Sequence, residues 1–446
     1  MKNDFRQSFH LEPQKGWLND PNGLCYFKGR YHVYFQYAPD SAKGAGNKCW
    51  GHFQSKDLTS WEFTGTVLFP DTPDDRNGVY SGCGFVRDDT LYLFYTGNVK
   101  EKGDYDYITA GRGANTILVT TKDGVTMSEK KVLLRNRDYP QYCSCHVRDP
   151  KVWEQGGEYF MVLGARTLDD KGCVLFYKSD DLENWQFDKT VFSQDGSYMW
   201  ECPDVFDIGA RRFLSASPQG VEHGEYKNQN VYSAGYFAFD SAPSDFEEWD
   251  YGFDFYAPQT FKAPDSRRII IGWMGIGDIP YTNPTTELGW QHCLTVPCEL
   301  TLAGNGKLRR EPVAELEKLV TQRSALLDGK GEFELPFYLT ASAQAESFEL
   351  RLSDAVQMTF EGGVFTLRFL DEKVGCGRDA RRVKLDSCDS IRVLADKTSL
   401  EIFLNGGEKV LSTRFYPMDT ALTVVSQGLS CEAMQLGKME VSYLGK

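Results

Sequence analysis

The sequence lacks long hydrophobic runs. No window of its 446 residues approaches the ~18 consecutive apolar residues that a membrane-spanning helix needs. The first residues, MKNDFRQSFHLEPQKG, hold no apolar segment of about 7–15 residues, so we expect no secretory signal peptide. Positive charge is also scarce, with 49 Lys and Arg against 63 Asp and Glu. The net charge of −14 argues against nucleic acid or an anionic membrane as the main partner.

Histidine is rare as well, and the 6 histidines show no metal-ligand spacing such as HExxH. The 12 cysteines are scattered along the chain. The closest pair, Cys143 and Cys145, has no second pair at zinc-finger spacing, so we expect no metal site. Scattered cysteines without an export signal indicate reduced thiols and a cytoplasmic protein.

Aromatic residues, by contrast, are abundant, at 14% of the chain. Packing in a β-rich core and sugar stacking in a cleft both explain this share, and the two are compatible. Short apolar strands also recur, each entered from a turn, as in KGRYHVYFQY, RDDTLYLFYTG and QGGEYFMVLGA. Equivalent positions in these strands lie about 60 residues apart. They are Tyr31, Leu91, Tyr159, Phe213 and Ile269.

This repeat predicts an all-β fold in two domains. Five units fit into residues 1–305, which is typical of a five-bladed β-propeller closed around an axis. Residues 306–331 are predicted to be a linker with a short helix, because Val313 and Leu316 begin a helical spacing. Alternating strands such as SFELRLS and VFTLRFL then predict a β-sandwich over 332–446. We expect this second domain to stabilise the protein or serve its assembly.

Three acidic residues fall at about the same phase of the repeat. Asp20 in GWLNDPNG, Asp149 in HVRDPKVW and Glu201 in MWECPDVF precede the strands of units one, three and four. The innermost strands of a propeller line its axis, so we expect these acids to converge there. Clustered carboxylates repel, which raises the pKa of one and gives the acid and base pair of a glycosidase. Nearby tryptophans are candidates for an apolar sugar platform, with core packing as the alternative: Trp17, Trp50, Trp200 and Trp273.

At these residues the chain resembles glycoside hydrolase family 32, which comprises invertases, fructanases and sucrose-6-phosphate hydrolases. WLNDPNG is similar to the nucleophile motif of the family, RDP to its second motif, and EC in WECPD to its acid/base motif. YSG, FQY, DFYAPQTF, GWMG and GWQHCLTVPCELTL also match, as does SLEIFLNGGEKVLSTRFYP in the second domain. The fold that this resemblance implies is a five-bladed propeller followed by a β-sandwich, in agreement with the repeat.

The resemblance also implies roles for single residues. Asp20 would be the nucleophile at the anomeric carbon of a terminal fructosyl unit, and Glu201 the acid and base. Their carboxyl groups would lie about 5 Å apart, because the family retains configuration. Asp149, kept ionised by Arg148, would hold fructose hydroxyls. No metal or organic cofactor is implied. Four further residues would line the fructose pocket: Asn19, Gln36, Tyr80 and Ser81.

The chain departs from the family at QYAPDSAKGAGNKCWGH, where many members have QYNP and a further Trp. This stretch carries Lys43 and Lys48, and its K-x-WGH pattern resembles the bacterial sucrose-6-phosphate hydrolases. A lysine here, with Lys48 as the main candidate, either binds a phosphate or is a solvated loop charge. Cys298 stands where many members have arginine, and no consequence follows from it.

The predicted function is a β-fructofuranosidase that acts on sucrose, sucrose 6-phosphate or short fructo-oligosaccharides. Its partner would be a small sugar, and no sequence feature assigns an oligomeric state. One alternative is fructosyl transfer, in which a sugar replaces water as the acceptor. A second is an inverting pentosidase on a related propeller, and a third is a sugar-binding propeller without catalysis.

Overall fold

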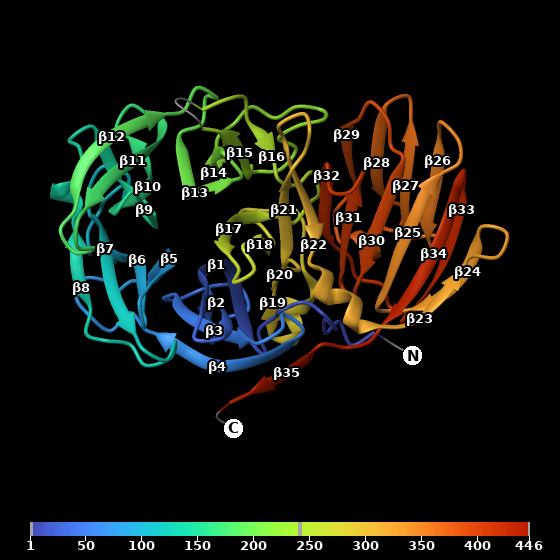
Figure 1. Cartoon of the computed structure of the whole chain (residues 1–446), viewed down its shortest axis with the longest axis horizontal. Helices are drawn as coiled ribbons and strands as arrows, with labels where there is room; N and C mark the ends of the chain where they lie inside the picture. Colours follow the sequence, from blue (N-terminus) through green and yellow to red (C-terminus); the bar gives the residue numbers. More distant parts are fainter. Residues whose placement is uncertain (1–2, 240–242, 445–446) are drawn as a thin grey trace.

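The computed structural model describes residues 3–239 and 243–444, which form two β-domains lying side by side (Figure 1). The N-terminal part of the chain is a ring of sheets, and the C-terminal part is a two-layered sandwich. In the described ranges the helices are all short, and none is long and apolar enough to cross a membrane. These helices are η1 (Asn136–Asp138), η2 (Pro284–Leu288), η3 (Ala314–Leu319) and α1 (Glu372–Gly375).

Five sheets, counted over the described residues, make up the propeller, and each is built around four antiparallel strands. The first sheet holds β1 (Gly16–Phe27), β2 (Arg30–Ala38), β3 (Cys49–Ser55) and β4 (Ser60–Leu68); the second β5 (Val79–Arg87), β6 (Thr90–Lys100), β7 (Arg112–Thr121) and β8 (Lys131–Leu134); the third β9 (Cys143–Gln155), β10 (Glu158–Thr167), β11 (Gly172–Ser179) and β12 (Gln186–Phe192); the fourth β13 (Met199–Ile208), β14 (Arg211–Gln219), β15 (Gly235–Ala238) and β16 (Glu247–Glu248); the fifth β17 (Tyr256–Lys262), β18 (Arg268–Met274), β20 (Cys293–Leu294), β21 (Cys298–Leu302) and β22 (Leu308–Pro312).

The ring closes through the first strand of each sheet. β1 contacts β5, β5 contacts β9, β9 contacts β13, β13 contacts β17, and β17 returns to β1. β19 (Trp290–Gln291), which follows the fifth sheet's second strand, pairs in parallel with Gly16 and Trp17 of β1. Because each sheet edge at the axis faces a neighbour, the ring leaves no inner edge free for another chain. The predicted propeller fold is confirmed.

Each first strand carries a β-bulge at about the same height, where two of its residues stand opposite one residue of the second strand. In the last three sheets the bulge begins with a residue of positive φ, namely Asp149, Cys202 or Ala257 (φ 63°, 46° and 47°), and continues with a proline. Proline fits there because a bulge leaves one N–H out of the ladder. The bulged pairs are Asn19–Asp20, Tyr80–Ser81, Asp149–Pro150, Cys202–Pro203 and Ala257–Pro258.

The sandwich consists of two six-stranded sheets packed face to face. One sheet holds β23 (Val320–Ala325), β25 (Phe337–Ala343), β30 (Ser390–Ala395), β31 (Ser399–Leu404), β32 (Lys409–Arg414) and β34 (Leu429–Leu436); the other holds β24 (Lys330–Glu334), β26 (Phe348–Leu352), β27 (Val356–Glu361), β28 (Val364–Phe369), β29 (Ala380–Lys384) and β33 (Ala421–Gln427).

Strands of both domains enter the segment 306–331 that was predicted as a linker. β22 is the outer strand of the fifth propeller sheet, and β23 is an edge strand of the sandwich. The short helix between them is the 3₁₀ helix η3. We therefore propose that the domain boundary lies at η3. No sequence pattern predicted β35 (Glu440–Tyr443), which leaves the sandwich and pairs in parallel with β4 of the propeller (Figure 1).

Buried ion pairs join the two domains. His10 of the N-terminal segment lies between Asp396 and Glu401 of the sandwich, at 2.8 Å and 2.9 Å. Arg378 pairs with Asp254, which precedes the fifth sheet, through Nε and Nη2 at 2.7 Å and 2.8 Å. Charges buried in this way lock a geometry more than they add free energy, because each charge must first lose its hydration.

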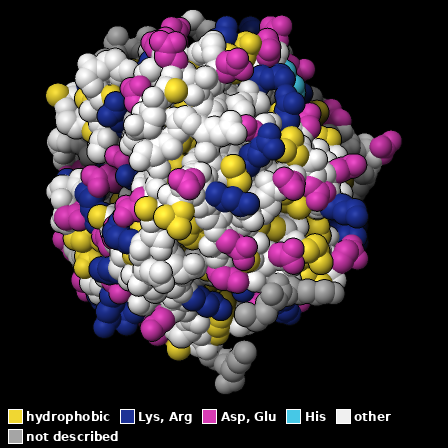
Figure 2. Space-filling view, turned by 90° about the vertical axis from the view of Figure 1, so that its right-hand side faces the viewer, with side chains coloured by type: hydrophobic (Ala, Val, Ile, Leu, Met, Phe, Trp, Pro, Cys, Tyr) yellow, Lys and Arg dark blue, Asp and Glu magenta, His cyan; other side chains and the backbone are white. Residues whose placement is uncertain are grey.

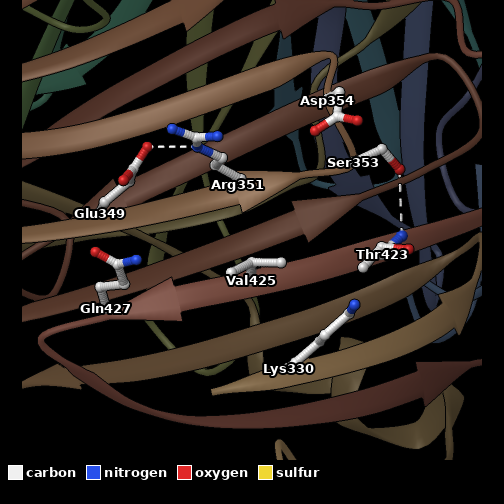
Figure 3. A pocket seen from close by; sticks show the side chains of 8 residues that line it. All are labelled: Lys330, Glu349, Arg351, Ser353, Asp354, Thr423, Val425 and Gln427. Atoms are coloured by element: carbon white, nitrogen blue, oxygen red, sulfur yellow. Dashed lines mark hydrogen bonds and ion pairs between the residues drawn. The ribbon is translucent and has the colours of Figure 1, made fainter. Parts of the chain in front are cut away.

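The sandwich presents a mixed surface. Figure 2 views the molecule from the right-hand side of Figure 1, where the sandwich lies, and shows acidic and basic side chains interspersed, with hydrophobic side chains scattered between them. A groove of about 380 Å³ crosses its second sheet (Figure 3). Glu349 and Arg351 form an ion pair in the groove, and Lys330 and Asp354 also line it. The lining residues include no aromatic ring, so the groove lacks the platform on which sugars stack.

Candidate active site

The three predicted acids meet at the propeller axis. Asp20, Asp149 and Glu201 act on one another electrostatically, and all three carry side chains that are largely withdrawn from solvent. Farther along the first strands, past the bulges, buried polar contacts fill the axis. Lys151 Nζ lies 3.1 Å from Asp204 Oδ2, and Gln259 Nε2 donates to the Gly82 carbonyl at 3.0 Å.

Asp20 is held by neighbouring donors. The Ser81 hydroxyl donates to Oδ2, and Asn19 Nδ2 donates to Oδ1 at 3.1 Å. Asn22 Nδ2 fixes the backbone by donating to the Asp20 carbonyl at 2.9 Å. Burial raises the pKa of Asp20; the charge of Glu201 adds to the rise, and the bonds from Ser81 and Asn19 oppose it.

Asp149 lies in the left-handed region of φ and contacts the fourth sheet. Its backbone N–H donates to Thr96 Oγ1 at 2.9 Å, and its Oδ2 accepts the Cys202 N–H at 2.9 Å. Burial is the largest cause of a raised pKa of Asp149, and the charge of Glu201 contributes further. Arg148, whose Nε lies 4.0 Å away, opposes the rise in the predicted direction but does not overcome burial.

Glu201 accepts four hydrogen bonds. Arg148 Nε and Nη2 lie 3.1 Å and 2.6 Å from Oε1. Tyr256 Oη and Gln219 Nε2 donate to Oε2 at 2.6 Å and 2.7 Å. Burial and the charge of Glu201 raise the pKa of Tyr256, so this hydroxyl keeps its proton and acts as a donor.

The register of the sheets refines the predicted phase of the acids. Arg148, Glu201 and Tyr256 each pair with the second strand directly before the bulge of their sheets. Glu201 is therefore equivalent to Arg148, whereas the residue equivalent to Asp149 is Cys202. Because these three equivalent residues lie in adjacent sheets, they form a chain of contacts around the axis with Glu201 at its centre.

The residues predicted to line a fructose pocket also gather here. Asn19 Nδ2 donates to Gln36 Oε1 as well as to Asp20, and Gln36 is the single residue opposite the first bulge. Ser81 is buried against Asp20. The hydroxyl of Tyr80 lies near Arg112 and interacts with it electrostatically.

The tryptophans divide into a part-exposed one and a buried group. Trp17 is part-exposed, and its Nε1 donates to Asn19 Oδ1 at 3.0 Å. Trp50 and Trp200 are 0% and 1% exposed, which excludes direct stacking on a sugar. The predicted contact of Trp50 with a sugar is therefore replaced by a structural one. Its Nε1 donates to the Tyr80 carbonyl at 3.1 Å and so holds the backbone of a residue at the site. Trp273 is 4% exposed and packs on Trp17 with ring centroids 5.8 Å apart, so it backs the aromatic wall.

The two lysines of the divergent stretch differ. Lys48 lies 5.5 Å from the Trp17 ring, donates to the Gly44 carbonyl, and is subject to the charge of Asp20. Burial lowers the pKa of Lys48. Lys43 is exposed and lies 3.7 Å from Glu287 at the surface, in agreement with the alternative of a solvated charge.

Sequence reasoning missed three residues of the site: Tyr256, Gln219 and Cys202. A signal existed for two of them. Tyr256 lies two residues before Pro258, as Glu201 lies two residues before Pro203. Cys202 directly precedes Pro203, as Asp149 directly precedes Pro150. No sequence signal pointed to Gln219. It lies at the end of β14, the second strand of the fourth sheet, and contacts Glu201 only because the sheet pairs the two strands.

Comparisons with known proteins identify the family of the chain. Residues 10–312 match the N-terminal domain of glycosyl hydrolases family 32, and residues 307–441 match the C-terminal domain of that family. The chain is 36% identical to a sucrose-6-phosphate hydrolase of Bacillus subtilis over 97% of this chain and 93% of that protein. It is also 36% identical to a raffinose invertase of Escherichia coli, over 92% and 89%.

Two solved structures extend the likeness. One is a sucrose-6-phosphate hydrolase from Lactobacillus gasseri, with a TM-score of 0.88 and 25% identity over 98% of this chain and 94% of that chain. The other is a β-fructofuranosidase mutant from Bombyx mori in complex with sucrose, with a TM-score of 0.85 and 30% identity over 98% and 95%. Both domains are matched from end to end, and the chain belongs to glycosyl hydrolase family 32.

Proposed function

We propose that this enzyme is a retaining β-fructofuranosidase that releases terminal β-D-fructosyl units by double displacement. The observation that carries the proposal is the meeting of Asp20, Asp149 and Glu201 at the axis, with Glu201 held on both carboxyl oxygens. Relatives named sucrose-6-phosphate hydrolase and raffinose invertase support the same class of reaction.

In the first step, a carboxylate oxygen of Asp20 attacks the anomeric carbon of the fructosyl unit. The bond from that carbon to the glycosidic oxygen breaks, and Glu201 transfers its proton to the departing oxygen. Ser81 and Asn19 fix the direction of the Asp20 carboxylate through hydrogen bonds to its two oxygens.

In the second step, Glu201 takes a proton from water. The oxygen of that water attacks the anomeric carbon, the ester bond to Asp20 breaks, and fructose leaves. Arg148 stabilises the carboxylate form of Glu201 after each proton donation, and Tyr256 and Gln219 keep its orientation constant.

Asp149 supports the charged transition state. Its Oδ2 is held by the Cys202 N–H, which leaves Oδ1 to accept hydrogen bonds from fructose hydroxyls. Such bonds strengthen as positive charge develops on the ring, so they lower the barrier more than they tighten ground-state binding.

The substrates we propose are sucrose, sucrose 6-phosphate and short fructo-oligosaccharides. We propose the cytoplasm as the compartment, because all 12 cysteines are free thiols and most are buried. Buried thiols at this density fit a reducing environment.

The test is to incubate the purified enzyme with sucrose, sucrose 6-phosphate and 1-kestose and to follow free fructose. Release of fructose from at least one of them is the expected result, and no release from any of the three would contradict the proposal. Products at high sucrose concentration separate hydrolysis from transfer, since transfer yields longer oligosaccharides in place of free fructose.

A further inference from the structure

Arg112, at the start of β7, is a part-buried cation beside the site, and no carboxylate pairs with it in the part of the chain that the structure describes. Its Nε–H is buried and has no acceptor among the described residues. Burial lowers the pKa of the guanidinium, and the groups that act on its charge include Arg148, Lys100, Tyr80 and Cys145, none of which is a carboxylate. Arginine stays protonated at this degree of burial, so Arg112 brings a positive charge without a counter-charge.

Three other arginines of low exposure each pair with a carboxylate, whereas the buried Arg414 donates to Thr398 and Cys293. Arg148 pairs with Glu201, Arg310 with Asp250 at 2.6 Å, and Arg378 with Asp254. The chain also carries a net charge of −14, so acidic partners are plentiful. Withdrawing an unpaired guanidinium from water costs free energy that only an anion offsets well.

Two further arginines and a neutral histidine lie near Arg112. His146 Nδ1 accepts from Arg148 Nη1 at 2.7 Å, and it also feels the charges of Arg112 and Arg166. Burial and these three arginines lower the pKa of His146 to about 3, so it stays neutral at physiological pH. Arg148 and Arg166 are paired with Glu201 and Asp170, so among these three arginines it is Arg112 whose charge is left for an anion at the edge between the second and third sheets.

The position of this edge connects it with the leaving group. Glu201 protonates the glycosidic oxygen in the proposed mechanism, so the departing sugar lies on its side of the site. Arg148 contacts Glu201 and lies beside Arg112. Lys48, in contrast, lies by Trp17 and is subject to the charge of the nucleophile Asp20.

We propose that Arg112 binds the phosphate of a phosphorylated leaving sugar, with the hydroxyl of Tyr80 as a second donor. Tyr80 interacts with Arg112, and its phenolic hydroxyl has a hydrogen that can point at the same anion. A guanidinium matches phosphate with two parallel N–H bonds, and a lysine offers only a point charge. This inference rests on the proposed function and makes Arg112 a specificity residue for sucrose 6-phosphate.

The experiment compares kcat/KM for sucrose 6-phosphate and for sucrose in the wild type and in Arg112→Gln. The ratio of the two values should fall by about tenfold or more, the factor that ~1.4 kcal/mol of binding provides, because the loss on sucrose 6-phosphate should exceed any loss on sucrose. Arg137→Gln is the matched control, because Arg137 belongs to the same sheet region and is 80% exposed. An equal loss on both substrates would assign Arg112 a structural role and overturn the proposal.

Product inhibition supplies an independent readout. Glucose 6-phosphate should inhibit sucrose hydrolysis more strongly than glucose or inorganic phosphate does, and Arg112→Gln should remove the difference. A ratio that falls in Lys48→Met but not in Arg112→Gln would move the phosphate to Lys48 and overturn the inference. Wild-type enzyme that hydrolyses sucrose at least as well as sucrose 6-phosphate would overturn it too, with the fructosidase function intact. Failure of the wild-type enzyme to hydrolyse either sugar would instead contradict the proposed function.

Discussion

Arg148 donates two hydrogen bonds to a single carboxylate oxygen of Glu201: its Nε and Nη2 lie 3.1 Å and 2.6 Å from Oε1. The other oxygen is held by Tyr256 and Gln219, so the carboxyl group has one orientation. A group that gives and then takes a proton at one atom requires such a fixed position.

Replacing Arg148 by lysine should therefore lower kcat by about 10²–10³-fold, because an ammonium cannot reproduce the planar fork. Steady-state kinetics on sucrose checks the loss, and thermal unfolding checks that the variant is folded. A change of kcat by less than about twofold would show that the orientation of Glu201 does not depend on this fork.

Glu201→Gln should lose activity according to the leaving group. On sucrose, whose leaving oxygen needs a proton, we expect a loss of about 10²–10⁴-fold. An aryl β-fructofuranoside with an acidic phenol should suffer much less, because that oxygen departs without protonation. Equal losses on both substrates would argue against Glu201 as the acid.

The stereochemistry of the product tests the two-step route. Attack by Asp20 followed by attack of water inverts the anomeric carbon twice, so β-D-fructofuranose should appear first. Proton NMR in the first minutes of the reaction records the anomer before it equilibrates. The α anomer would indicate an inverting enzyme with carboxyl groups about 6.5–9.5 Å apart, in place of the predicted separation of about 5 Å.

His10 makes the joint between the domains sensitive to alkaline pH. Burial lowers its pKa, but hydrogen bonds and charges of Asp396 and Glu401 outweigh this and raise it to about 9. Its ordinary value is 6.5, so the stabilisation is fully present below pH 6.5 and is lost as the pH rises through 9. The free energy of unfolding should fall by up to about 3 kcal/mol over this interval.

Denaturant unfolding between pH 7 and 9 measures this slope, and His10→Gln should flatten it. The buried Glu12, whose pKa burial raises to about 7, titrates at the lower end of this window in wild type and variant alike, so the difference between their slopes reports on His10. The same slope in wild type and variant would show that another group carries the dependence.

The sequence predicted the acids because two kinds of regularity overlapped: a repeat of strands, and a proline in or next to the bulge of four of the five sheets. Glu201 was assigned to the phase of Asp149, since a one-residue offset is invisible without the ladder that pairs Glu201 with Ser217. The burial of Trp50 was also beyond reach, because its neighbours Tyr34 and Tyr95 come from different sheets. β35 spans four residues and has no pattern of its own, so only its partner β4 defines it.

The central claim is that Asp20 forms the bond to the fructosyl unit, and Asp20→Asn tests it most directly. The amide keeps the shape of the side chain but is a far weaker nucleophile, so kcat on sucrose should fall by about 10⁴-fold or more. The unfolding temperature should stay the same or rise, because burial raises the pKa of Asp20 and the asparagine carries no charge to desolvate. A folded Asp20→Asn enzyme with kcat within about tenfold of wild type would contradict the mechanism.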